Sequence, residues 1–142
     1  MKQILVAVDE HPHAEEIVEC AVRLATEISA KILLIFVVEE RHVPENYRDE
    51  HGDELPEHFY ADVFQRTVSP FLKYITKAGV KVEGITGVGD PVKEILKTAK
   101  ARNVSYIVVG TRGLRYWGRL RAINSVSRNV IEKSVIPVVA VP

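Results

Sequence analysis

Short apolar runs that alternate with segments of helical periodicity constrain this chain more than any other feature of its sequence. The runs occupy residues 4–8, 32–38, 80–85, 106–109 and 137–141. Three of them (ILVAV, ILLIFVV and YIVV) are continuous rather than alternating, which is typical of strands covered on both faces. Strands that alternate with helices favour an α/β fold in which a parallel sheet carries helices on both of its faces.

The segments between the runs have the spacing of amphipathic helices. In residues 14–28 and 60–75, apolar side chains recur at i, i+3, i+4 and i+7. Pro70 lies inside the second segment and predicts a kink there. Asp90-Pro91 is typical of an N-cap followed by proline at the first helical position, so it predicts the start of a third helix. A fourth helix can begin at Asn124 or Ser125.

Length and composition predict one cytoplasmic domain over residues 1–142. A chain of 142 residues is long enough to bury one core. Nineteen basic side chains balance nineteen acidic ones, which gives no indication of nucleic-acid or membrane-surface binding. No apolar run approaches the roughly 20 residues that a membrane-spanning helix needs, and no signal-peptide pattern follows Met1. The single cysteine, Cys20, cannot form a disulfide within the chain.

The balanced net charge conceals two oppositely charged segments. Residues 39–62 contain nine acidic side chains and two arginines, and a solvated face is the ordinary interpretation of such a segment. Residues 110–128 contain five arginines and no acid. Four of these arginines lie between the end of one predicted strand and the start of the last predicted helix, so a solvated face explains them less well.

A candidate ligand site follows from the expected strand order. Ligands of open parallel sheets bind beyond the carboxyl ends of the strands, at the point where the strand order reverses. In a sheet of order 3-2-1-4-5, the first and fourth strands are neighbours at that point. Asp9 would then face the segment from Gly110 to Gly113, where glycine permits close backbone approach to a ligand. Ser125, at the start of the last helix, would add N–H groups and a hydroxyl suited to phosphate.

Several segments together make the chain resemble the universal stress protein family over essentially its whole length. They are ILVAVD, ILLIFVV, GVGDPVKEILKTA, YIVVGTRG and SVSRNVIEKSVIPVVAVP. The resemblance implies a single-domain, Rossmann-like, five-stranded parallel sheet and a role in the stress response. It also implies a homodimer, which we expect to form through strand 135–141, because that apolar edge carries no charge. In one branch of the family, the resemblance further implies ATP binding.

The ATP-binding branch has a motif of glycine, two residues, glycine, nine residues and then glycine followed by serine or threonine. Gly110, Gly113 and Ser125 match this motif. Asn124 replaces the last glycine of the motif, and ten residues instead of nine separate it from Gly113. By the resemblance, Asp9 and the backbone of Val37 hold the adenosine end of the nucleotide. The remaining residues that would line the site or bind phosphate are Val8, Val109, Arg112, Arg115, Arg119, Asn124 and Val126.

Three functions stay open at this stage. The first is a regulatory protein that binds ATP, with Mg or Mn as an accompanying ion, and performs no efficient catalysis, because no nucleophile–base set or paired carboxylates can be assigned. The second is a homodimeric interaction module of the same family that has lost nucleotide binding, as Asn124 and the longer loop indicate. The third is a slow ATP hydrolase that uses Asp9 with a divalent ion.

Overall fold

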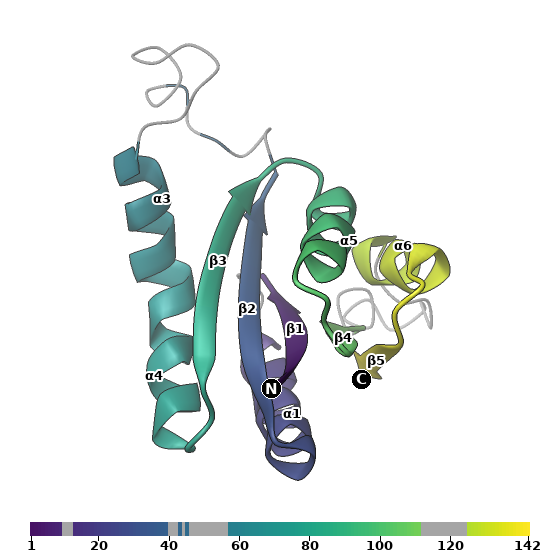
Figure 1. Cartoon of the computed structure of the whole chain (residues 1–142). Helices are drawn as coiled ribbons and strands as arrows, with labels where there is room; N and C mark the ends of the chain where they lie inside the picture. The colour runs from purple at the N-terminus through teal and green to yellow at the C-terminus, as the bar shows by residue number, and fades with distance from the viewer. Residues whose placement is uncertain (10–12, 40–42, 44, 46–56, 112–124) are drawn as a thin grey trace.

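Five parallel strands form one sheet in the order β3-β2-β1-β4-β5, which confirms the strand order predicted from the sequence. The computed structural model describes residues 1–9, 13–39, 43, 45, 57–111 and 125–142. Figure 1 shows β3, β2 and β1 side by side, with α3 and α4 to the left of them and α5 and α6 to the right. The strands are β1 (Lys2–Val8), β2 (Ala30–Val38), β3 (Val82–Val88), β4 (Tyr106–Gly110) and β5 (Val138–Val141).

Helices cover both faces of the sheet, as expected for this class. One face carries α1 (Ala14–Ile28) and a long helical segment composed of α3 (Glu57–Val63), η2 (Phe64–Val68) and α4 (Ser69–Lys77). The other face carries α5 (Pro91–Ala101) and α6 (Ser125–Lys133), which also contact each other. We call these the α1 face and the α5 face.

Alternate side chains of each strand divide the core between these two faces. Along β1, Val6 packs on the α1 face and Leu5 on the α5 face, and both are fully buried. Leu34 and Leu33 of β2 divide in the same way. The continuous apolar runs of the sequence therefore correspond to strands buried on both sides, as predicted.

The helix predicted around Pro70 is present but is longer than predicted and changes its geometry. Helical structure extends from Glu57 to Lys77, and a π-helical turn, η2, occupies Phe64–Val68 directly before Ser69-Pro70. Pro70 has no N–H, so the carbonyl four residues earlier loses its α-helical donor. The chain adopts i→i+5 bonding just before the proline, and the N–H of Ser69 donates to the carbonyl of Phe64.

The last strand is shorter than the predicted 135–141, because it begins only at Val138. The Ser134 hydroxyl accepts from the N–H of Ile136 (2.9 Å) and donates to the carbonyl of the same residue (2.7 Å). This local turn competes with strand pairing and leaves the Val135 side chain 97% exposed. The third strand is also displaced from the predicted 80–85 to Val82–Val88.

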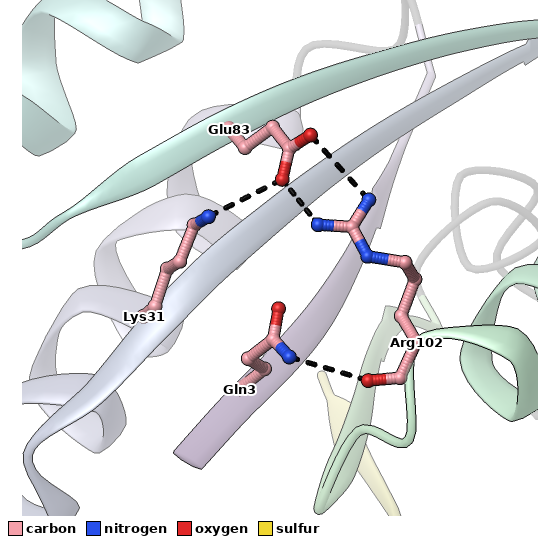
Figure 2. Close-up of polar contacts among 4 residues, drawn as sticks. All are labelled: Gln3, Lys31, Glu83 and Arg102. Carbon is pink, nitrogen blue, oxygen red and sulfur yellow. Dashed lines mark hydrogen bonds and ion pairs between the residues drawn. The ribbon is translucent and has the colours of Figure 1, made fainter. Parts of the chain in front are cut away.

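A polar network ties three strands to the end of α5 at the amino end of the sheet. Figure 2 shows Arg102, just after α5, in a two-pronged ion pair with the Glu83 carboxylate of β3. Lys31 of β2 donates to the same carboxylate at 3.3 Å, and Gln3 Nε2 of β1 donates to the Arg102 carbonyl at 3.2 Å. The hydrogen bond from Arg102 holds the pKa of the Glu83 carboxyl below the ordinary 4.5, with a further lowering by Lys31.

Glu83 should contribute stability that disappears in acid. Its pKa is lower in the folded chain, so its contribution is complete above pH 4.5 and is lost as the pH falls through the lowered value. The carboxylate side chain is 42% exposed, which limits the contribution to less than about 1 kcal/mol. In urea unfolding, Glu83→Gln should be less stable than the wild type at pH 7, and this deficit should shrink steadily as the pH is lowered below 4.5. A deficit that does not change with pH would contradict this prediction, and Glu27→Gln, an exposed glutamate of α1, is the control.

Candidate functional site

The carboxyl ends of β1 and β4 lie side by side, where the strand order reverses. Val6 of β1 pairs with Val108 of β4 in parallel register. The same register carried two residues further places Val8 beside Gly110. Asp9, which is exposed, thus leaves the sheet next to the residues that follow β4. Gly110 is the last residue of β4, whereas the sequence predicts that the strand ends at Val109.

Hydrogen bonds fix the start of α6 against this point. The buried Ser127 hydroxyl, in the first turn of α6, donates to the Gly110 carbonyl at 2.5 Å. The N–H and the hydroxyl of Thr111 both donate to the Val141 carbonyl of β5, at 2.9 and 3.2 Å. Ser125 is the first residue of α6 and is exposed. The N–H groups that begin an α-helix have no partner within it, so this turn presents donors at the switch point of the sheet.

Gly110 has a packing reason to be glycine. A Cβ at this position would lie 2.4 Å from Cδ1 and 3.0 Å from Cγ1 of Ile17, a residue of α1. The sequence suggested close approach of the backbone to a ligand as the reason. The structure shows that the end of β4 also passes directly under a buried side chain of α1.

The apolar side chains predicted to line the site divide between the two faces of the sheet. Val37, Val109 and Val126 pack in the core of the α5 face. Val8 packs in the core of the α1 face. A ligand on the α5 face could contact the side chains of Val37, Val109 and Val126, but it would contact only the backbone of Val8.

The predicted arginine segment cannot be placed on this framework. Gly113 and Asn124 of the motif lie outside the residues that the structure describes, as do Arg112, Arg115 and Arg119. Most of the acidic stretch 39–62 lies outside them too. Across the described ranges, no group of three or more histidine, cysteine, aspartate or glutamate side chains could hold a metal ion. The same ranges contain no helix long and apolar enough to cross a membrane.

Sequence reasoning missed one polar group near this end of the sheet. Glu94, in the first turn of α5, extends its carboxylate over the backbone of Gly87, the penultimate residue of β3, and Gly89, which follows the strand. In this segment the sequence predicts only the helix cap at Asp90-Pro91. The cap is confirmed, because Asp90 Oδ1 accepts from the N–H of Val92 at 3.0 Å. Gly87 and Gly89 were the signal in the sequence that could have indicated Glu94, because the absence of their side chains leaves the space that the Glu94 carboxylate occupies.

A doubly wound parallel sheet with polar groups and a helix start at its switch point defines a Rossmann-like α/β protein, a class in which ligands bind beyond the carboxyl ends of the strands. The model of the universal stress protein family matches residues 1–142, and the chain belongs to that family. Universal stress protein YxiE of Bacillus subtilis (strain 168) is 32% identical over 146 residues, which cover 98% of this chain and 97% of YxiE.

Solved structures share the fold over nearly the full length. Hypothetical protein MJ0577 superposes with a TM-score of 0.79 at 28% identity, covering 99% of this chain and 94% of that one. A universal stress protein from Archaeoglobus fulgidus in complex with dAMP has a TM-score of 0.72 at 21% identity, with 100% and 98% coverage. A universal stress protein in complex with cAMP has a TM-score of 0.71 at 23% identity, with 99% and 95% coverage. Some proteins of this fold thus bind adenine nucleotides.

Proposed function

We propose that this chain is a regulatory protein of the universal stress type that binds an adenine nucleotide, ATP, where β1 and β4 end. The observation that carries the proposal is the meeting of three groups at one point. These are Asp9, which directly follows β1, the end of β4 at Gly110, and the first turn of α6, which the Ser127 hydrogen bond holds against Gly110. The dAMP and cAMP complexes of proteins with the same fold support adenine nucleotide as the ligand class.

The three groups suit the two ends of a nucleotide. The positive end of the α6 dipole, the exposed hydroxyl of Ser125 and the first N–H groups of the helix favour phosphate. Asp9 and the backbone of Val37 would hold the nucleoside, as the family resemblance implies. Arg112, Arg115 and Arg119 would neutralise the polyphosphate with charge-assisted hydrogen bonds, and a Mg or Mn ion would accompany it. We infer no turnover, because no nucleophile with an adjacent base is assigned.

Asn124 gives a specific reason to keep one alternative. It replaces the motif glycine, and ten residues separate it from Gly113. Asparagine accepts a left-handed backbone better than most residues, so the turn can persist. If its side chain instead blocks the phosphates, the chain is a dimeric interaction module. Slow ATP hydrolysis at Asp9 would appear as phosphate release under excess ATP.

Asp9→Ala should weaken ATP and adenosine by the same factor, about 10-fold or more. A carboxylate that accepts a hydrogen bond from the nucleoside contributes to both ligands equally, and such charged bonds are worth ~1.5–3 kcal/mol. Isothermal titration calorimetry of the two ligands measures this effect, with mass spectrometry of the denatured supernatant to detect nucleotide that co-purifies. Glu27→Ala, on α1 at the amino end of the sheet, is the matched control.

Two results would contradict the proposal. No heat with millimolar ATP and no co-purified nucleotide would favour the interaction module. Normal ATP binding by Asp9→Ala would show that the nucleotide lies elsewhere.

We propose in addition that two copies pair through β5. This strand ends the sheet, and residues 134–142 carry no charged side chain that would oppose pairing. Ile131 and Val135, which precede the strand, add exposed apolar surface beside it.

A further inference from the structure

Glu94 lies in the first turn of α5, where the helix dipole favours an acidic side chain, and its carboxylate extends over the end of β3. It is the fourth residue of α5, after the Asp90 cap has already taken the N–H of Val92. Its Oε1 lies 3.5 Å from where a Cβ of Gly89 would stand, and its Oε2 lies 3.8 Å from the same position at Gly87. The side chain therefore extends back over the end of β3 and is half-exposed there.

This carboxylate has no hydrogen-bonding or ionic partner among the described residues. The contrast with Glu83 on the same strand-and-helix unit is direct, because Glu83 is paired with both Arg102 and Lys31 (Figure 2). Glu94 is only half-exposed, so part of its hydration is already lost. An ionised carboxylate can only accept hydrogen bonds, so the group that would complete it must be a donor.

The position of Glu94 along the carboxyl end of the sheet indicates which part of a nucleotide it would meet. Gly87 pairs with Val37, and α5 packs over β2 and β3 on the face where Val37 and Val126 lie. In the sheet, β3 is three strands away from β4, or about 14 Å at the usual strand spacing. If the phosphates bind at β4 and α6 and the ribose lies near β1, the base extends toward the ends of β2 and β3.

We propose that Glu94 selects the base by accepting a hydrogen bond from the exocyclic amino group of adenine. This inference rests on the proposed function and adds a specificity-determining residue to the same site. Of the donors on adenosine, the amino group is the one farthest from the phosphates. Bases without a donor at this position leave the half-buried carboxylate desolvated and unpaired, and a site of this kind rejects such analogues.

A cycle of two ligands and two proteins tests the proposal. The ligands are ATP and purine riboside triphosphate, in which hydrogen replaces the amino group. The wild type should bind ATP about 10- to 100-fold more tightly, as expected for a hydrogen bond to a charged group. In Glu94→Ala the two affinities should become equal within about 3-fold, which isolates the pairwise interaction. In Glu94→Gln, which keeps a neutral acceptor, the ratio of the two affinities should lie between the ratios of the wild type and Glu94→Ala. Glu27→Ala should keep the full wild-type ratio.

The outcomes separate this inference from the proposed function. Equal binding of both ligands by the wild type would overturn the role of Glu94 and leave ATP binding intact. A purely structural Glu94 would weaken both ligands alike in the variant and leave their ratio unchanged, which would also overturn it. The ratio of the affinities for ATP and 2′-deoxy-ATP should be the same in Glu94→Ala as in the wild type, because a change in this ratio would assign the carboxylate to the ribose. If the wild type binds no nucleotide, the proposed function fails and this inference fails with it. Thermal unfolding by circular dichroism verifies that each variant is folded.

Discussion

Gly84→Ala should lower the free energy of unfolding by about 1–3 kcal/mol, the range found when a methyl group is forced into a packed core. A Cβ at this position of β3 would lie 2.6 Å from Phe64 Cε2 and 2.8 Å from Val68 Cγ1. Both side chains belong to η2, the π-helical turn before Pro70, and Val68 is fully buried. The missing side chain of Gly84 is what lets this turn rest directly on the strand, so alanine must displace it.

Gly87→Ala provides a matched control in the same strand. The closest atom to its Cβ would be Glu94 Oε2 at 3.8 Å, which is an ordinary contact. Both changes add one methyl group and remove the same backbone freedom, so their difference reports the clash with η2. Urea unfolding measures both. If Gly84→Ala is as stable as Gly87→Ala, the helix does not press on β3 as the structure indicates.

Ala140→Pro should convert the proposed dimer into a monomer at micromolar concentration. The carbonyls of Pro137 and Val141 accept from the N–H groups of Ile107 and Thr111 of the neighbouring strand segment. Residues of a parallel strand alternate in the side to which they hydrogen-bond, so the N–H of Ala140 points away from β4. Proline removes this outward donor and leaves the bonds to β4 in place.

Ala140→Val is the control, because it keeps the N–H and suits a strand. Val139 is less suitable for the test, since its side chain is half-buried against the core and a polar residue there would also disturb the fold. Analytical ultracentrifugation compares the three proteins. A monomeric wild type, or an Ala140→Pro variant that sediments as a dimer, would rule out pairing through β5.

The sheet could be predicted because its determinants are local or topological. Continuous apolar runs mark strands covered on both faces, and Asp90-Pro91 marks a helix start by a cap that the structure contains. The right-handed crossover rule then leaves few strand orders, of which 3-2-1-4-5 places Asp9 beside Gly110. For the same reason, the end of the sheet where a ligand would bind followed from the sequence.

Details that depend on contacts between distant segments were not predictable. Nothing near Gly110 in the sequence points to Ile17, whose side chain occupies the space of its missing Cβ. One detail was missed although its cause is local: the apolar pair Val135-Ile136 resembles a strand, but hydrogen bonds between the Ser134 hydroxyl and Ile136 form a turn there. The carboxylate of Glu94 was overlooked because its place over the end of β3 exists only once α5 has packed on the sheet. The proposed phosphate contacts of the segment from Arg112 to Asn124 stay a prediction, because these residues lie outside the described ranges.

The paired hydrogen bonds from Thr111 to the Val141 carbonyl have a practical consequence for handling the protein. A fluorophore or affinity tag joined after Pro142 would be attached one residue from the carbonyl that anchors the chain leaving β4. It would also adjoin the strand through which two copies are expected to meet. Met1 is 78% exposed and precedes β1 at the opposite end of the sheet. Labels for titration and sedimentation are therefore better placed before Met1, away from the proposed nucleotide site and the proposed dimer contact.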